Sequence, residues 1–316
     1  MNSVRRELKQ TGKMTKPQLA SLTGLSVVTI NALVKELVEA GELFEDDAVP
    51  SNGGRPAVTY RFNYNFRLAL VVQIIEKQDH ELYLAKIFNL REEILAAVEH
   101  RLQSFDMSAL CSVIDDLLQQ FPAVGVIGIG IPGQSVDGEI KVSGSAGMKG
   151  IRLIEEVQSR FEVPVVVEND VNAAVSGYCH REQFGEGKCV LGIYFPGTKS
   201  PGMGIFIDGK IVRGKDGMAG EIKYLPLDFL HWDALDAAEE FPEVICKMML
   251  ILNAVLAPDQ IVVYSEEVDA QLLKETWDAC KANYAMPSFP DIVVSASFAK
   301  DFEEGMRYLS LRELGS

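Results

Sequence analysis

The sequence predicts an α/β protein in which a small N-terminal winged helix-turn-helix precedes a larger domain of alternating strands and helices. Two short helical patterns joined by a glycine turn lie between residues 15 and 40. A short ribbon follows them and closes on Gly53-Gly54-Arg55-Pro56. From about residue 68 onward, strand and helix patterns alternate, which is typical of an α/β domain.

Length and composition limit the possible classes of protein. With 316 residues the chain is too long for one compact core, since single domains typically hold about 100 to 200 residues. Its 47% hydrophobic and 24% charged residues are ordinary for a soluble globular protein. No apolar run approaches the ~20 residues of a membrane helix, and no signal-peptide core follows the first residues. We therefore expect a cytoplasmic protein without membrane contact.

The net charge of −15 is unevenly distributed. Residues 1–67 carry nine Lys and Arg against seven Asp and Glu, a net +2, and the rest of the chain carries −17. The acidic part would repel DNA, whereas the N-terminal part can approach phosphate.

Cysteines and histidines give no sign of a metal site. The five cysteines are scattered and include no Cys-x-x-Cys, which predicts free thiols rather than a disulfide frame. The four histidines lack the spacing of metal ligands.

The first two helices are indicated by spacing and capping. Val4 and Leu8 share one face of a helix over residues 3–11. Thr15 and Gln18 have the spacing of a capping box at the start of the next helix. We expect Leu19, Ala20 and Leu22 to form the packing face of that helix.

The next helix has the pattern of a recognition helix. Gly24 allows the tight turn, and Ser26 caps the helix. Its predicted buried stripe is Ile30, Leu33, Val34 and Leu37. The opposite side would face the major groove. The residues predicted to face DNA are Ser26, Val28, Thr29, Asn31, Ala32, Lys35 and, on the ribbon, Arg55.

The chemistry of this exposed set predicts the operator. Asn31 can bond a base edge, preferably adenine, while Val28 and Ala32 touch thymine methyl groups and Lys35 lies near phosphate. We therefore expect A/T-biased half-sites. Glu45, Asp46 and Asp47 are expected to make the wing tip acidic, so that it contacts little phosphate.

The large module contains a buried strand that runs into a helix with polar residues at the junction. Val163–Val167 is apolar, and Asn169 and Asp170 follow it. Such a junction lies at the ligand-facing edge of an α/β sheet. The two residues can bind a ligand there, or simply cap the helix that begins near Val171.

The N-terminal stretch resembles the DNA-binding domain of ROK-family regulators, on Leu19-Ala20, Thr23-Gly24-Leu25-Ser26 and Gly53-Gly54-Arg55-Pro56. In that resemblance Arg55 lies at the wing and reaches the DNA backbone or a narrow minor groove.

Residues 68–316 resemble the ROK sugar-kinase domain, a two-lobed actin-like ATPase fold. The matching motifs are Gly130-x-Pro132-Gly133, Glu168-Asn169-Asp170, Asn172-Ala173-Ala174, Gly204–Gly209 and Ala219-Gly220-Glu221-Ile222. The resemblance implies that Asp170 stands where the kinases hold their general base, and that Asn169 and Glu221 contact the sugar. These three residues form the predicted effector site.

Other kinase motifs are altered. The first phosphate loop is expected near Gln73–Asp79, which contains no glycine and no acid at the magnesium position. The second loop, Gly197–Gly204, contains Pro201, which lacks an amide donor. Tyr264-Ser265 replaces the Gly-Gly of the adenosine site, and Tyr224 replaces the zinc-binding His. We therefore predict no catalytic residues, no bound metal and no ATP, magnesium or zinc as cofactor.

The sugar site is retained only in part. Gly144 and Met148 stand in place of the Asn and Trp of one sugar-binding loop, and Tyr178 replaces a helix glutamate. The predicted division of the chain is a DNA-binding domain, 1–66, and a kinase-like domain, 67–316. The latter has one lobe of residues 67–172 plus 299–316 and a second of residues 173–298.

Three functions are compatible with the sequence. The leading prediction is a dimeric or tetrameric transcriptional regulator, a repressor of carbohydrate-related genes, which binds an inverted repeat and responds to a sugar-like effector. The second is an ATP-dependent sugar kinase with an appended DNA-binding domain. The third is a DNA-binding dimer whose large domain is only a scaffold.

Overall fold

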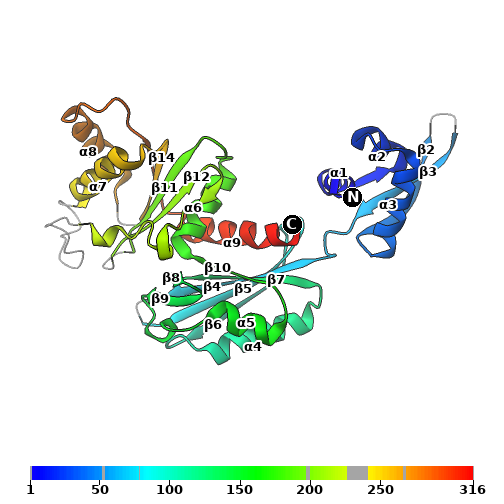
Figure 1. Cartoon of the computed structure of the whole chain (residues 1–316), viewed down its shortest axis with the longest axis horizontal. Coiled ribbons are helices and arrows are strands. Elements are labelled where there is room, and N and C mark those ends of the chain that lie inside the picture. The colour runs from blue at the N-terminus through cyan, green and yellow to red at the C-terminus, as the bar shows by residue number, and fades with distance from the viewer. Residues whose placement is uncertain are drawn as a thin grey trace.

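The computed structural model describes residues 2–51, 54–77, 79–196, 200–225, 241–265 and 268–315. Figure 1 shows a small N-terminal module beside two larger lobes, each built on a β-sheet, with the C-terminal helix α9 between them. Within the described residues, no single helix is long and apolar enough to cross a membrane.

The N-terminal module combines helices with a small antiparallel sheet. Its elements are α1 (Asn2–Thr11), β1 (Lys13–Thr15), α2 (Lys16–Thr23), α3 (Val27–Glu39), β2 (Leu43–Ser51) and β3 (Gly54–Phe62). Strand β3 is central in the order β1-β3-β2. The predicted sequence of two helices, glycine turn and ribbon is present.

The capping and turn residues position α2 against α3. The Thr15 hydroxyl accepts from the Gln18 amide at 3.4 Å, and the Gln18 side chain accepts from the Thr15 amide at 2.8 Å. Gly24 ends α2 with φ of 69°, a conformation that L side chains rarely adopt. The two helices are bent by 116° relative to each other, a helix-turn-helix angle.

One packing prediction in α2 is wrong. Leu22 is 58% exposed, whereas Leu19 is fully buried and Ala20 packs partly against the same core. At about 100° per residue, Leu22 lies roughly 60° from Leu19 on the side away from Ala20. The buried face of this short helix is narrow and leaves Leu22 in solvent.

The first large sheet has the strand order β10-β7-β4-β5-β6. Its strands are β4 (Leu68–Glu76), β5 (Glu81–Asn89), β6 (Ile94–Leu102), β7 (Val124–Ile131) and β10 (Val165–Asn169). Strands β4, β5 and β6 are antiparallel, whereas β7 and β10 run parallel to β4. Helices α4 (Met107–Gln120) and α5 (Leu153–Phe161) pack on one face around a continuous apolar core. The hairpin β8 (Gly133–Val136) and β9 (Glu139–Ser143) and the 3-10 turn η1 (Ala146–Met148) extend this lobe.

The second large sheet repeats the same topology. Its order is β13-β12-β11-β14-β15, with strands β11 (Cys189–Tyr194), β12 (Gly202–Ile207), β13 (Lys210–Ile211), β14 (Gln260–Tyr264) and β15 (Asp291–Ser295). Again the first three strands in chain order are antiparallel and the last two are parallel to the first. Helices α7 (Phe241–Leu256) and α8 (Ala270–Ala282) pack on it, and 3-10 turns η2 (Lys215–Gly217) and η3 (Ile222–Tyr224) follow β13. Each lobe therefore has the same strand order and directions.

Two helices cross where the lobes meet. These are α6 (Asp170–Arg181), which begins at the end of β10, and α9 (Phe298–Gly315). Helix α9 also lies against the first sheet, where Phe302 comes so close to Gly130 that a Cβ there would be 2.4 Å from its ring. The C-terminal helix thus returns to the first lobe.

Candidate functional site

The exposed face of α3 contains every predicted DNA-facing residue of that helix. Ser26 and Thr29 at its start and Asn31, Ala32 and Lys35 along it are all exposed, and Val28 is 79% exposed. On the opposite side, Ile30, Val34 and Leu37 are at most 1% exposed. The helix is therefore held by one face and free on the other.

The start of α3 is fixed by its cap. The Ser26 hydroxyl accepts from the Thr29 amide at 3.1 Å and lies 2.8 Å from the Thr29 hydroxyl. These hydroxyl groups hold the first turn while remaining at the surface. Further along, Lys35 lies 3.7 Å from Glu39, and both side chains are well exposed. Such an exposed pair contributes little and leaves the Lys35 ammonium available.

The sequence prediction missed an apolar extension of this face. Leu22, at the end of α2, is 58% exposed, and Val27, at the start of α3, is 54% exposed. They lie on either side of the turn between the two helices, and Val27 directly precedes the exposed Val28. An apolar residue at the first position of a capped helix could have signalled this, because the first turn has few core neighbours.

The prediction of an acidic wing tip is wrong for the residues that can be placed. The register pairs Glu45 with Tyr60 and Asp46 with Thr59, whereas the far end of the ribbon pairs Ser51 with Gly54. Asp46 forms ion pairs with Lys13 at 3.0 Å and Arg61 at 3.7 Å. The Asp46 carboxylate is therefore paired with basic side chains at the base of the ribbon, beside β1.

Part of the predicted wing lies outside the described residues. This holds for Gly53 and for the side chains of Asp47 and Arg55.

In the kinase-like lobes, Asn169 and Asp170 lie at the junction of β10 and α6. The side-chain carbonyl oxygen of Asn169 accepts hydrogen bonds from the backbone amides of Val171 at 3.0 Å and Asn172 at 3.1 Å. Its amide nitrogen donates to the Gly133 carbonyl and to Asp170, both at 3.0 Å. All four hydrogen bonds of this side chain are thus made within the protein. The capping role of Asn169 is present in the structure.

Asp170 is differently placed. One of its carboxylate oxygens accepts from the Val171 amide at 2.9 Å and from Asn169. Burial raises the pKa of Asp170 to about 7; these hydrogen bonds oppose the shift, and the Glu76 carboxylate adds to it. Glu76 lies at the end of β4 and packs against Gly144. This edge of the sheet brings together two carboxyl groups.

Glu168 and Glu221 each form an ion pair with a basic side chain. Glu168, on β10, is buried, accepts from Asn172 at 3.0 Å and forms an ion pair with Arg213, which follows β13 of the other sheet. The Glu221 carboxylate lies 2.8 Å from the Lys223 ammonium. The Glu168–Arg213 pair therefore joins the two lobes beside Asp170.

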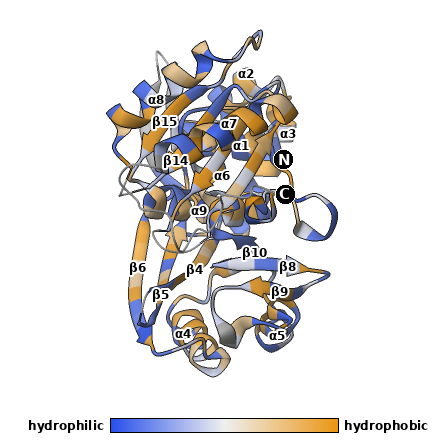
Figure 2. Ribbon diagram, turned by 90° about the vertical axis from the view of Figure 1, so that its left-hand side faces the viewer, coloured by the Kyte–Doolittle hydropathy of each residue, from blue (hydrophilic) through white to orange (hydrophobic). Residues whose placement is uncertain are grey.

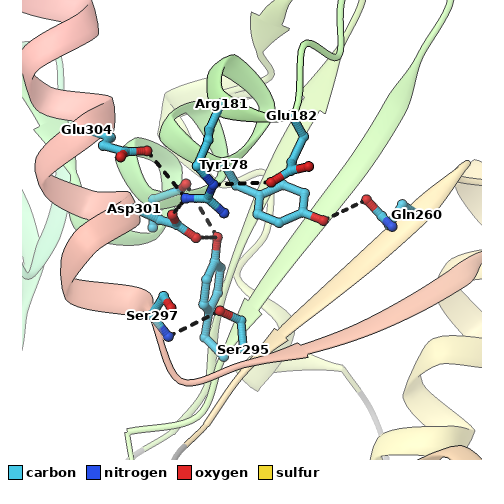
Figure 3. A network of polar contacts seen from close by, with 10 residues as sticks. Tyr178, Arg181, Glu182, Gln260, Ser295, Ser297, Asp301 and Glu304 are labelled. Atoms are coloured by element: carbon cyan, nitrogen blue, oxygen red, sulfur yellow. Dashed lines mark hydrogen bonds and ion pairs between the residues drawn. The ribbon is translucent and has the colours of Figure 1, made fainter.

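Several replaced kinase positions are occupied by core side chains. Tyr264 is fully buried, and its hydroxyl donates to Asp301 at 3.0 Å. Tyr178 is buried and bonds Gln260 at 3.0 Å. Figure 3 shows Tyr178 in a polar network with Arg181 and the α9 carboxylates. Tyr224 is 63% exposed.

The structure describes the first predicted phosphate-loop region more fully than the second. Strand β4 continues through Gln73 to Glu76 in register with β5, and Gln73 is 2% exposed. Regular strand therefore covers Gln73–Glu76, the first part of the region where that loop is expected. In the second, residues 197–199 lie outside the described residues, and Pro201 is buried.

Two hollows lie elsewhere on the molecule. One of about 450 Å³ is bounded by residues 102–107, Gly147 and Ile151, and one of about 360 Å³ lies between β4, β5 and α9. Neither is lined by Asn169, Asp170 or Glu221. Across the part of the chain that the structure describes, no three His, Cys, Asp or Glu side chains are grouped to hold a metal ion.

Comparison with known proteins finds a family match within the large module. Residues 86–232 match the ROK family. This part of the chain is therefore similar to the ROK family. The predicted resemblance is confirmed.

The named proteins that this chain resembles in sequence include transcriptional regulators. It is 26% identical over 236 residues to the xylose repressor of Bacillus spizizenii, covering 71% of this chain and 59% of the repressor. It is 23% identical over 238 residues to the DNA-binding transcriptional dual regulator NagC of Escherichia coli, covering 72% of this chain and 57% of NagC. The chain spans less than two thirds of the length of either relative.

Solved structures share the fold. A ROK-family transcriptional regulator homologous to the E. coli MLC protein superposes with a TM-score of 0.65 and 17% identity, covering 99% of this chain and 98% of that one. The ROK hexokinase of Thermus thermophilus superposes with a TM-score of 0.62 and 16% identity, covering 78% of this chain and 99% of that one. The α/β fold with a ROK sugar-kinase-like domain is thus confirmed.

Proposed function

We propose that this chain is a sequence-specific DNA-binding transcriptional regulator, a repressor of carbohydrate-related genes that acts in the cytoplasm. Residues 1–66 form its winged helix-turn-helix, and residues 67–316 form a kinase-like domain of the two predicted lobes. The observation that carries the proposal is α3, which is capped and buried on one side and exposes Val28, Asn31 and Lys35 on the other. Similarity to the xylose repressor supports it.

DNA contact follows from the chemistry of this face. Asn31 has both an amide donor and an acceptor, which suits the major-groove edge of adenine, and exposed Val28 and Ala32 suit thymine methyl groups. The exposed Leu22 and Val27 extend the apolar part toward the helix start. We infer an operator with A/T-biased half-sites, arranged as an inverted repeat and read by two copies.

The test is selection of random duplex DNA by the purified protein at near-physiological salt, followed by sequencing. We expect an enriched A/T-biased inverted repeat. A pool without enrichment, both with and without a panel of sugars, would overturn the proposal.

The effector site is proposed at Asp170 and Glu221 rather than at Asn169. Since the four hydrogen bonds of Asn169 are made internally, a sugar there would have to displace one of them. Asp170 and Glu221 can accept from sugar hydroxyl groups. A thermal-shift screen with sugars, sugar phosphates and amino sugars tests this, because a ligand of the native state raises the melting temperature. Loss of the shift in Asp170→Ala supports the site, whereas no shift with any ligand favours a scaffold without effector.

A sugar kinase is the second candidate, because Asp170 keeps the position of the general base and its pKa of about 7 suits proton transfer. The continuous β4 strand at Gln73 and the buried Tyr264 at the adenosine position argue against a nucleotide site. We therefore propose that the protein is not an enzyme and uses no ATP, magnesium or zinc. A coupled assay with ATP, magnesium and a sugar panel decides, and turnover that Asp170→Ala abolishes would establish the kinase.

A further inference from the structure

Strand β6 is a long edge strand with an unusual surface. It has nine residues, whereas the other strands at the edges of the two large sheets, β10, β13 and β15, have five, two and five. Among the described residues, β6 pairs with β5 on one side and with no strand on the other. Its outer edge therefore offers unpaired backbone amides and carbonyls.

Beyond a register irregularity between Ile94 and Ala96, β6 pairs regularly with β5 over residues 96–102, so this part of its edge is not bulged. Ile94, Leu95 and Val98 are 51%, 37% and 41% exposed, and the strand contains neither lysine nor proline. Figure 2 places β6 at the outer side of the first sheet, with much of its length coloured as hydrophobic. Exposed edges of soluble proteins are usually shortened, bulged or charged, because a bare edge recruits another strand.

The charged side chains of β6 favour pairing with a second copy of the same strand. Glu99 and Arg101 lie on one face of the strand, 3.0 Å apart, and their side chains are 49% and 70% exposed. If a second β6 lies antiparallel about a two-fold axis at His100, Glu99 of each copy falls opposite Arg101 of the other. The same register places Val98 opposite Leu102. The sequence is thus self-complementary in charge and apolar character.

We propose that β6 is a self-association surface, through which two copies of this chain form an antiparallel strand pair centred on His100. The two sheets then become one continuous sheet, and backbone hydrogen bonds are made across residues 98–102. Opposite charges directly across an antiparallel pair stabilise it, and like charges destabilise it.

The position of β6 suits a two-fold DNA reader, although the proposal does not depend on DNA binding. Ile94 lies next to Phe88, close to the start of β4, where the chain leaves the N-terminal module. Ile94 is six positions from His100, so the two Ile94 residues would be roughly 40 Å apart at ~3.3 Å per residue. This is of the same order as one turn of DNA, ~34 Å.

Sedimentation of the full chain without DNA, over a range of concentrations, tests the surface. We expect a dimer for the wild type and at least about tenfold weaker association for Glu99→Arg, which places like charges opposite Arg101. Glu156→Arg on α5 makes the same charge change at an exposed site elsewhere and should leave the dimer intact. The double variant Glu99→Arg with Arg101→Glu restores the opposite charges and should restore the dimer.

A second variant tests the register directly. His100→Cys places a thiol opposite itself, so mild oxidation should cross-link two copies, whereas the wild type with its native thiols should remain uncross-linked. A monomeric wild type overturns the proposal. The partner of the β6 edge would then be a strand of another protein. A dimer that Glu99→Arg does not weaken, or that His100→Cys does not cross-link, overturns it as well.

Discussion

Gly305 of α9 lies against the backbone of Ala173 on α6 so closely that a Cβ added at Gly305 would be 1.8 Å from the Ala173 carbonyl oxygen. Gly177 on α6 makes the reciprocal approach, with a Cβ position 2.1 Å from the Asp301 carbonyl oxygen. The helices at the lobe junction therefore touch backbone to backbone. Since backbone atoms cannot rotate away, any change in the lobe angle must be accommodated around this contact.

Substitution of Gly305 by alanine should destabilise the protein. The added methyl group must push the helices apart, and overpacking of this kind costs about 1–3 kcal/mol or more. Gly315→Ala is the matched control on the same helix, because its Cβ position has no atom within 4 Å. We expect a lower urea midpoint for Gly305→Ala only. Equal midpoints for the two variants would mean that the contact yields easily.

Asn31 and Lys35 should affect DNA binding in different ways. Asn31→Ala removes a base-edge contact and should cost about 1–3 kcal/mol on the selected operator, with relaxed preference at one position. Lys35→Ala removes a phosphate contact, so it should weaken all sequences similarly and reduce the salt slope by about one. Fluorescence anisotropy on operator and random duplexes measures both. If Asn31→Ala weakens binding equally on both duplexes, the proposed orientation of α3 on DNA is wrong.

Asp170 should make stability depend on pH in the acidic range. The pKa of an unfolded aspartate is about 3.9, and that of Asp170 is raised to about 7. The native state therefore holds the extra proton between these values, so this contribution is full below about pH 4 and is lost as pH rises to about 7. One proton accounts for at most about 1.4 kcal/mol per pH unit.

Urea unfolding between pH 5 and 8 checks this dependence. Asp170→Asn should flatten the profile and gain stability over the wild type as pH rises. Glu76→Gln, which removes the neighbouring negative charge, should move the wild-type profile to lower pH. A wild-type profile that Asp170→Asn leaves unchanged would contradict the raised pKa.

The elements whose signals are local could be predicted from the sequence. Thr15 with Gln18, Gly24 and Ser26 each act through neighbours within four residues, and the predicted cap, turn and cap are all present. The DNA-facing side of α3 followed from the same periodicity that predicts its buried side.

Features that depend on partners distant in the sequence could not be predicted. Strand β6 lacks the alternation of a half-buried strand, because both its faces are largely exposed. One of the internal hydrogen bonds of the Asn169 side chain is made to the carbonyl of Gly133, which lies 36 positions earlier. The position of Asp46 away from the wing tip depends on the register of β2 on β3, which cannot be read from either strand alone.

The polar network at the lobe junction gives a final prediction. Asp301 has no exposed surface, and its carboxylate accepts from Arg181 of α6 and from Tyr264 of β14. Burial raises the pKa of Asp301, and both hydrogen bonds oppose that shift. Figure 3 shows that the network joins α6, α9 and the second sheet. Removal of one partner from such a buried pair leaves a charge without full compensation.

We expect a graded series of variants in urea unfolding. Asp301→Asn should cost about 3–5 kcal/mol, because Arg181 loses its buried ionic partner and keeps the more exposed carboxylates of Glu304 and Glu182. Tyr264→Phe removes one hydrogen bond and should cost about 1 kcal/mol. Glu304→Gln, at a partly exposed site 3.3 Å from Arg181, should cost less than Asp301→Asn. If Asp301→Asn costs no more than Glu304→Gln, the buried pair does not hold the junction together, and the glycine contact between α6 and α9, the apolar residues around it and the Glu168–Arg213 pair must do so.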